Sequence, residues 1–276
     1  MGVCEAARAG MAAGGETINH FMSQLDDAVY SGDAKICFWD LECSSLFADF
    51  GFAICVGYKF LGDKDVKIIR VDQFRGFRTD PTNDKKLVAA LAKVLSKADI
   101  LVTHYGSSGR FDRRFLNTRL LYHGLSPLPP IKEVDTWHIA KTKLALTSNR
   151  LGAIVELLDL PEKTPIKRPV WIRAMSGHRP SINYIATHCA RDIEVLEAAY
   201  LKLRSLAGKH ANVSLFSCGK DGKARCPVCG SLKVQKKGYN IASSRVTQRY
   251  QCQSCGAWGH GRAEKVGKEI KMRKCV

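Results

Sequence analysis

The order of the sequence patterns is the feature that most limits which fold this chain can adopt. Three β-rich segments come first, at residues 35–43, 50–60 and 66–74, and Gly62-Asp63 supplies a turn between the second and the third. Such a run predicts three antiparallel strands. Helical and strand patterns then alternate to about residue 206. This order predicts an α/β fold.

The later elements are defined by their periodicity and by the residues that end them. Residues 83–97 place apolar side chains on one helical face, and residues 110–123 form a second helical pattern that Gly124 closes. The other predicted elements are strands at 99–104 and 133–135, and helices from 136 to about 146, at 150–158, at 181–206 and around 19–30.

Composition and charge change near residue 208, and this change divides the chain. Residues 208–276 hold 15 Lys plus Arg against 3 Asp plus Glu, which is +12 of the formal net charge of +17. A concentrated positive charge indicates a polyanionic partner, with nucleic acid as the first choice. We predict a flexible leader at 1–34, an α/β domain at 35–207, a Gly/Ser/Lys-rich linker at 208–223, a small module at 224–262 and a basic tail at 263–276.

The compartment is inferred from the N-terminus and from the cysteines. Residues 1–15 are rich in Ala and Gly and lack the continuous apolar core of an export signal. The apolar stretch 50–60 is too short to span a bilayer, so no membrane partner is expected. Eleven cysteines in such a chain indicate a reducing compartment. We therefore expect a cytoplasmic protein.

Two cysteine pairs in the C-terminal module have the spacing of a metal site. Cys226 and Cys229 form one pair, Cys252 and Cys255 form the other, and a glycine follows each pair. In a reducing compartment this pattern predicts one structural Zn²⁺ held by the four thiolates. A redox-active pair is the alternative, but it would need a thioredoxin-like setting. We treat the spare residues as non-ligands; they are Cys218, Cys275 and His260.

The α/β part carries carboxylates in three separate segments. Asp40 and Glu42 are two residues apart on the first predicted strand, so both side chains leave the same face. Two carboxylates on a buried strand repel each other, and a divalent cation relieves that repulsion. Solvated residues at a strand end are an equal alternative. Asp112 follows the fourth strand. Rather than binding a metal, it could cap the next helix or interact favourably with the dipole of that helix.

The third segment lies on the last predicted helix. His188 and Asp192 are four residues apart and therefore share a helical face, although such a pair is more often a surface ion pair. Asp135 is a tempting further acid, and we predict instead that it caps the helix that begins at Thr136. Four carboxylates and one histidine together are what a two-metal phosphodiesterase needs.

These three segments resemble the three motifs of the DEDD exonucleases, which are ribonuclease H-like 3′→5′ exonucleases. The resemblance covers residues 35–206 and implies a mixed five-stranded sheet flanked by helices. It also implies that two Mg²⁺ or Mn²⁺ ions are held by the four acids and that His188 is the general base; the acids are Asp40, Glu42, Asp112 and Asp192. An unperturbed imidazole pKa of about 6.5 suits that role.

Two departures from the family pattern stand out. Three residues separate His188 from Asp192, whereas the family's histidine subclass has four and its tyrosine subclass has three. Tyr184 is two helical turns before Asp192, too far to replace the histidine easily. The segment 104–110 is about two residues longer than the usual family form. Because this segment lies where substrate would approach, it leaves the substrate class open.

The run from Cys226 to Gly259 resembles zinc ribbons fused to insertion-sequence transposases. A module this small needs zinc because it cannot bury a sufficient core. Its charge favours contact with nucleic acid over a pure scaffold role, with a protein partner as the alternative. The residues predicted to make that contact are Lys233, Lys236, Lys237, Arg245, Arg249 and Trp258.

The sequence thus predicts a metal-dependent 3′→5′ exonuclease that hydrolyses phosphodiester bonds. DNA is preferred over RNA as substrate because the predicted ribbon resembles those of DNA-transacting proteins. Two other functions stay open: a structure-specific endonuclease on the same fold, and a nucleic-acid-binding protein without catalysis.

Overall fold

A computed structural model describes residues 33–107, 109–160, 166–217, 223–242 and 245–261 of the chain. The chain divides into two compact units, with the boundary between Leu203 and Arg204. The predicted leader up to residue 32, its helix around 19–30 and the basic tail at 263–276 lie outside the described residues. Among the described helices, none combines the length and apolar character needed to cross a bilayer.

A mixed five-stranded sheet forms the centre of the first unit. Its strand order is β3-β2-β1-β4-β5, with β1 to β3 antiparallel and β4 and β5 parallel to β1. The predicted antiparallel run and both later strands are therefore confirmed. The strands are β1 (Ile36–Cys43), β2 (Ala53–Phe60), β3 (Lys67–Arg70), β4 (Ile100–Thr103) and β5 (Lys132–Asp135).

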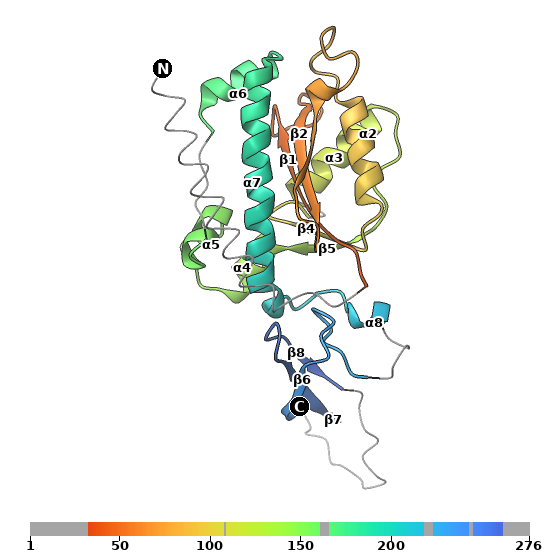
Figure 1. Cartoon of the computed structure of the whole chain (residues 1–276), viewed down its shortest axis with the longest axis vertical. Helices are drawn as coiled ribbons and strands as arrows, with labels where there is room; N and C mark the ends of the chain where they lie inside the picture. The colour runs from red at the N-terminus through yellow and green to blue at the C-terminus, as the bar shows by residue number, and fades with distance from the viewer. Residues whose placement is uncertain (1–32, 108, 161–165, 218–222, 243–244, 262–276) are drawn as a thin grey trace, which may run out of the picture. The chain divides into compact units, whose positions relative to one another are not determined.

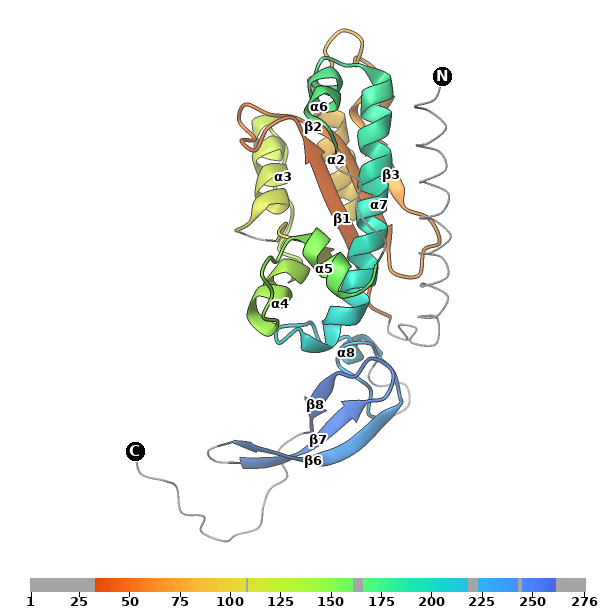
Figure 2. The same cartoon turned by 90° about the vertical axis from the view of Figure 1, so that its left-hand side faces the viewer.

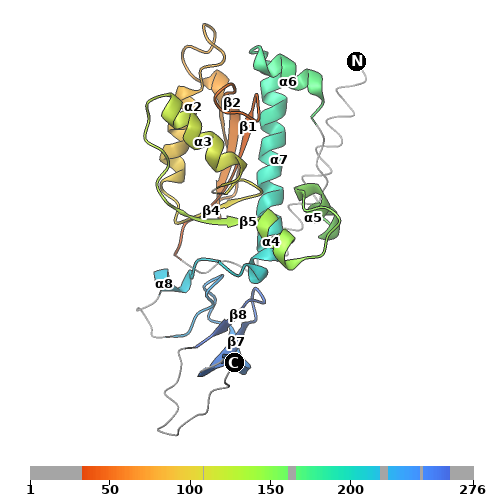
Figure 3. The ribbon, with the colours of Figure 1, turned by 180° about the vertical axis from the view of Figure 1, so that it is seen from behind.

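Helices cover both faces of this sheet. On one face lie α2 (Lys85–Leu95) and α3 (Phe111–Tyr122), which pack on each other, and on the other lies the long α7 (Arg179–Leu203) (Figures 1 and 3). The shorter helices lie on the side of α7; they are α4 (Thr136–Lys143), α5 (Leu151–Leu157) and α6 (Arg168–Met175).

The long helix α7 packs on the sheet through a continuous apolar face. The buried residues recur at helical spacing and include Ile182, Ile185, Cys189, Ile193 and Leu196. Opposite them on β2, Gly57 has no side chain, and Cys189 and Ile193 fill that space. A buried ion pair 2.7 Å long joins Lys59 of β2 to Glu197 of α7. These contacts fix where α7 lies along the strands.

Some elements differ from the sequence predictions. The helix α4 ends at Lys143 rather than near 146, because Leu144 is extended. The third strand is shorter than predicted, since the chain turns into the 3-10 helix η2 (Val71–Gln73). The helix α6 was not predicted: of its eight residues only Ala174 is buried, so it has no broad apolar stripe to detect.

The second unit is built on a three-stranded antiparallel sheet with the order β6-β7-β8 (Figure 2). Its strands are β6 (Val234–Ala242), β7 (Arg245–Cys252) and β8 (Trp258–His260). The segment predicted as a linker contributes the short helix α8 (Ser214–Ser217), which follows the 3-10 helix η3 (Arg204–Leu206). Val213 is fully buried, and its N–H donates to the Pro227 carbonyl at 2.8 Å.

Substitution of Gly57 by Ala tests the contact between α7 and β2. A Cβ atom there would lie 2.8 Å from Ile193 Cγ1 and 3.0 Å from Cys189 Sγ, so the helix would have to move. Overpacking of this kind costs roughly 1–3 kcal/mol, so we expect a lower thermal midpoint. The control is Gly152→Ala in α5, where a Cβ meets nothing within 4 Å and stability should hold or rise. Equal midpoints for the two variants would contradict this account of the packing.

Candidate active site and metal centre

The strand β1 carries two carboxylates beyond the point where β4 stops pairing with it. The parallel ladder ends at Phe38, which faces Val102, and Asp40 and Glu42 follow with half-buried side chains. Across the antiparallel ladder, Asp40 faces Gly57 and Glu42 faces Cys55. Because residues two apart on a strand share a face, both carboxylates point the same way.

The thiol of Cys189 on α7 lies against these two carboxylates. Its Sγ is 3.8 Å from the main-chain oxygen of Asp40 and 4.0 Å from Asp40 Oδ2. One ligand atom from each of Asp40, Glu42 and Cys189 lies within 4.8 Å of the others. Cys189 had no predicted role from the sequence. Its position between His188 and Asp192, on a helix expected to pack on the core, was the signal that could have identified it.

A hydrogen bond with Cys55 and burial hold the pKa of Cys189 well above the usual value of a thiol, and the two nearby carboxylates raise it further. The side chain is therefore a neutral thiol in the metal-free protein. It fills the space between α7 and β1 and lends no negative charge to the site.

Asp112 is the second residue of α3 and is buried against the same group of acids. Burial raises its pKa well above the usual value, and the charges of Asp40 and Glu42 raise it further. The carboxylate lies against the backbone of Gly106, where any Cβ atom would overlap it. A capping role is not what the structure shows, because the N-cap of α3 is Arg110 and no side chain caps it.

His188 and Asp192 lie one turn apart on α7. The distance from His188 Nε2 to Asp192 Oδ2 is 3.9 Å, and the two side chains are only 13% and 9% exposed. This burial is unlike a surface ion pair, which was the alternative from sequence. Tyr184 is on the same unbroken helix, two turns before Asp192, and is 43% exposed.

The donor set fits divalent cations. Carboxylate oxygens are the ligands that Mg²⁺ and Mn²⁺ prefer. Burial and the neighbouring carboxylates together raise the pKa of Asp112, and a bound cation would offset both effects. Asp40, Glu42 and Asp112 are close enough to interact electrostatically, and Asp192 lies one turn beyond Cys189 on the helix that contacts β1.

Asp135 has a structural role, as the sequence predicted. It is the N-cap of α4, and its carboxylate accepts hydrogen bonds from the N–H groups of Trp137 and His138. It also accepts from the N–H of Tyr105 at 3.0 Å. His104, which precedes Tyr105, places its Nδ1 2.9 Å from the Thr136 hydroxyl. These contacts organise the chain that leads from β4 to Asp112.

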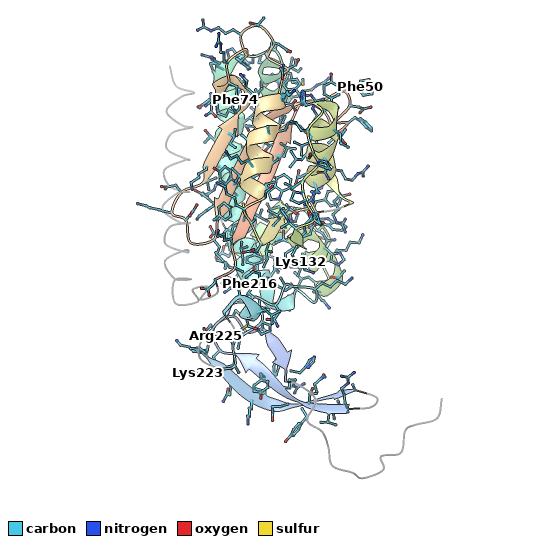
Figure 4. The ribbon with its side chains drawn as sticks, turned by 90° about the vertical axis from the view of Figure 1, so that its right-hand side faces the viewer. Phe50, Phe74, Lys132, Phe216, Lys223 and Arg225 are labelled. Atoms are coloured by element: carbon cyan, nitrogen blue, oxygen red, sulfur yellow. The ribbon has the colours of Figure 1, made fainter. Side chains whose placement is uncertain are left out.

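The loop after Glu42 is anchored by a buried charged network. Asp84 is fully buried and accepts hydrogen bonds from the Arg119 guanidinium and from the Ala53 N–H, and His123 Nε2 lies 2.6 Å from it. Arg119 also donates to the carbonyl of Ala48 at 3.0 Å. The loop exposes Phe50, whose side chain points away from the sheet (Figure 4).

The second unit brings the four predicted zinc ligands together. The Sγ atoms of Cys226 and Cys255 are 3.6 Å apart, and those of Cys229 and Cys252 are 3.7 Å apart. Tetrahedral coordination with Zn–S bonds of about 2.3 Å places sulfurs about 3.8 Å apart, whereas a disulfide needs about 2.0 Å. All four sulfurs lie within 4.8 Å of one another, and His260 is outside this group. The donor set therefore fits one Zn²⁺.

The two cysteine pairs have the same local geometry. The N–H groups of Val228 and Ser254 each donate to the first sulfur of their pair at 3.4 Å. Gly230 and Gly256 follow with φ values of 77° and 73°, in the left-handed region that the turn requires. Hydrogen bonds among the sulfurs hold the pKa of Cys226 well below the usual value and raise the pKa values of Cys229 and Cys255. One thiolate, the form that binds zinc, is therefore favoured in the metal-free group of four thiols.

The predicted nucleic-acid contacts fall on both faces of this small sheet. Arg245 and Arg249 share one face with Trp258, and the Arg249 guanidinium lies 4.9 Å from the Trp258 ring centre. Lys236 lies on the other face, opposite Tyr250. The Lys237 carbonyl accepts a hydrogen bond from Arg249, and Lys233 precedes the sheet. Figure 4 labels two further cations, Lys223 and Arg225, on the segment that leads into this sheet.

Comparison with known proteins supports the fold. Residues 37–165 match the family model RNase_H_2, described as RNase_H superfamily. The matched residues lie within the first unit, which is therefore similar to RNase H-superfamily domains. The mixed five-stranded sheet flanked by helices is therefore the predicted ribonuclease H-like fold, and that prediction is confirmed.

The chain is also similar in sequence to part of a curated protein. The chain is 32% identical over 153 residues to the DNA polymerase III PolC-type of Ureaplasma parvum serovar 3. The match covers 49% of this chain and 10% of that protein, so the chain spans about a tenth of the relative's length. The DEDD subtype and the likeness of the ribbon to those of transposases stay predictions.

Substitution of Asp112 by Asn tests the repulsion within the acidic site. A carboxyl group whose pKa is raised in the folded state loses stability as the pH rises from its unfolded pKa to its folded one. Asn has no proton to lose. In buffer without Mg²⁺ or Mn²⁺, the variant should therefore unfold a few degrees higher than the wild type at pH 8. That gain should shrink toward pH 4.

The control is Asp84→Asn, because Asp84 is equally buried but is paired with Arg119. Breaking that pair should lower the thermal midpoint. Added Mg²⁺ should raise the midpoint of the wild type more than that of Asp112→Asn. A loss of stability in Asp112→Asn that is the same at every pH would contradict a raised pKa of this carboxyl group in the folded protein.

Proposed function

We propose that this protein is a two-metal-dependent 3′→5′ exonuclease that hydrolyses the phosphodiester bonds of nucleic acid, DNA in preference to RNA. The observation that carries the proposal is the close approach of the Asp40 and Glu42 carboxylates, with which buried Asp112 interacts electrostatically, while His188 and Asp192 lie on the adjoining helix. The RNase H-superfamily match supports nuclease activity in general. The resemblance of the three motifs to the DEDD exonucleases supports the polarity.

The residues divide into ligands and a base. Asp40, Glu42, Asp112 and Asp192 would hold two Mg²⁺ or Mn²⁺ ions. When bound, these ions would neutralise the scissile phosphate and favour attack by water. His188 would accept the proton of that water, and Asp192, 3.9 Å away, would stabilise the imidazolium that forms.

The ribbon would hold one structural Zn²⁺ and bind the nucleic acid. Support comes from the four converging sulfurs and from the pairing of Arg249 with Trp258, which sets a cation and an aromatic ring on one face. The preference for DNA rests on the resemblance of the ribbon sequence to those of transposases. A cytoplasmic location stays an expectation from the cysteines.

Loss of the acids tests the reaction. We expect Asp40→Asn or Asp192→Asn to lower cleavage by roughly a hundredfold or more, because a metal that contributes several kcal/mol is lost. The assay uses 5′-labelled single-stranded DNA and RNA with Mg²⁺, Mn²⁺ or EDTA. The control is Asp65→Asn, an exposed acid in the turn between β2 and β3.

In that assay, a ladder that shortens from the 3′ end supports the exonuclease, and a single internal cut would favour an endonuclease. Near wild-type turnover in both acid variants would exclude the site. Faster cleavage of RNA than of DNA would reverse the assigned preference.

The role of His188 is tested by the pH profile. Because a general base works only when it is unprotonated, wild-type activity should rise with pH as the imidazole loses its proton. His188→Ala should lose most of the activity and flatten this rise. The control is His178→Ala, whose ring bonds to the Ser181 hydroxyl near the start of α7. An unchanged rate and profile in His188→Ala would identify His188 as a bystander and direct attention to Tyr184.

The role of the ribbon is tested by the salt dependence of binding. The full chain should lose affinity steeply with salt, at roughly one power of salt for each phosphate contact. A chain that ends at Leu206 should keep cleavage of short single strands but show weaker binding and a shallower slope. Cys226→Ser combined with Cys252→Ser should behave like the truncated chain, since the ribbon needs zinc to fold. Equal slopes and affinities for the three proteins would favour a protein partner for the ribbon.

A further inference from the structure

A group of aromatic and cationic side chains lies beside the acidic site and has no part in the chemistry above. The rings of Tyr105 and Trp137 meet edge to face, with their centres 5.0 Å apart. The Arg110 guanidinium lies 4.0 Å from the Trp137 ring centre and 5.2 Å from that of Tyr105. Lys141 Nζ lies 4.9 Å from the Trp137 ring centre. We call these four residues the aromatic cluster.

The cluster is held in place by the N-cap of α4. Asp135 positions Trp137 in the first turn of that helix, and Lys141 lies one turn further on. The same carboxylate accepts the N–H of Tyr105 at 3.0 Å and pairs with Arg110 Nε at 3.3 Å. One buried acid thus joins the two chain segments that supply all four side chains.

The backbone at Tyr105 is strained. Its φ of 66° is a left-handed conformation that residues other than glycine rarely adopt. Such strain persists only where the surrounding contacts impose it, and it is commonly found at functional sites. Here the contacts are with Asp135 and with the Phe111 N–H, which donates to the Tyr105 carbonyl at 3.1 Å.

The cluster adjoins the proposed site of cleavage. Gly106, the residue after Tyr105, lies directly against the carboxylate of Asp112. The charge of Asp135 also contributes to the raised pKa of Asp112. A chain of nucleic acid whose phosphate lies at the acids would therefore pass close to the Tyr105 ring.

The exposure of the cluster favours a ligand over a packing role. Tyr105 is 47% exposed, although its neighbour Gly106 is buried. Lys141 is exposed, and the Arg110 side chain is 25% exposed. An accessible ring beside one cation, with a second cation beside the neighbouring Trp137 ring, matches the two chemical features of a nucleotide, a flat base and a phosphate.

We propose that the aromatic cluster is a base-binding subsite, in which an unpaired nucleobase stacks on Tyr105 while Arg110 and Lys141 contact a phosphate. The proposal rests on the proposed function, because it takes the acids as the place of cleavage. Under this proposal, the lengthened segment 104–110 before Asp112 is the element that selects single strands. A base within a duplex already has both faces covered by its neighbours and cannot stack there.

The experiment compares an oligonucleotide that carries bases with one that does not. Binding of fluorescein-labelled ten-nucleotide single strands is measured in the Asp40→Asn background, where no hydrolysis is expected. One strand has normal bases, and the other has abasic sugars at all positions. Stacking of one base is worth a factor of roughly 5 to 100 in affinity. Tyr105→Ala and Tyr105→Leu should therefore weaken binding of the normal strand about 5-fold or more, and Tyr105→Phe should not.

The abasic strand should bind equally to all these variants, because only phosphate contacts are left. The matched control is Tyr122→Ala: its ring is also exposed and lies 4.3 Å from a guanidinium, that of Arg119, but at the other end of α3 from Asp112. Contacts made by the ribbon are common to all variants. For that reason, the KM for hydrolysis of the normal strand is also measured in chains that retain Asp40, because only strands bound at the acids are hydrolysed. This KM should rise in Tyr105→Ala.

The outcomes separate this subsite from the proposed hydrolysis. An equal loss of affinity on both strands would overturn stacking and leave a structural role for Tyr105. Equal affinities and equal KM values for all variants would also overturn it. Suppose that the chain without the Asp40→Asn substitution hydrolyses neither strand, yet binding still depends on Tyr105 and on the bases. The proposed function then fails and the subsite stands.

Discussion

The contact between α7 and β2 decides where His188 and Asp192 lie relative to Asp40 on β1. Gly57 faces Asp40 across the strand ladder, and its missing side chain lets Cys189 and Ile193 approach the sheet. His188 and Asp192 flank Cys189 on the same helix, so this one close approach brings them toward the carboxylates of β1. The buried pair of Lys59 and Glu197 adds a directional contact one turn further along. A purely apolar interface would tolerate a small slide of the helix, whereas an ion pair deprived of its partner would be costly.

Three buried aspartates have different roles in this domain, and the surroundings of each side chain determine its role. Asp84 is surrounded by donors from Arg119 and Ala53, so its charge is compensated and it anchors a loop. Asp135 accepts backbone N–H groups and orders a helix start. Asp112 is different: burial and other carboxylates raise its pKa, an arrangement that weakens the metal-free protein. A carboxylate that is buried beside other carboxylates would be stabilised by a bound cation, as the proposed function requires.

The sequence was sufficient for features that depend on local periodicity or fixed spacing. The strands β1 and β2, the helix α3 and the cap at Asp135 follow from such patterns, and so does the convergence of the cysteines. Features that depend on tertiary contacts were missed. The helix α6 shows no apolar stripe, and Val213 lies in a segment that reads as a linker although it is fully buried. The roles of the acids and of His188 stay predictions, because they concern a reaction rather than a fold.

The extended segment before Asp112 is where this chain departs from the family pattern and where the structure adds most. From sequence it was only a loop of unusual length. In the structure Asp135 ties both ends of it, at Tyr105 and at Arg110, to the start of α4. The described ends of the segment are therefore held in place. Tyr105 has a strained backbone conformation with an exposed ring, and Gly106 approaches Asp112 closely. Asp40 and Glu42 lie on β1, Asp192 lies on α7, and Asp112 lies on α3, whereas the aromatic cluster comes from this segment and from α4. What the domain recognises can thus change while β1 and α7 stay as they are.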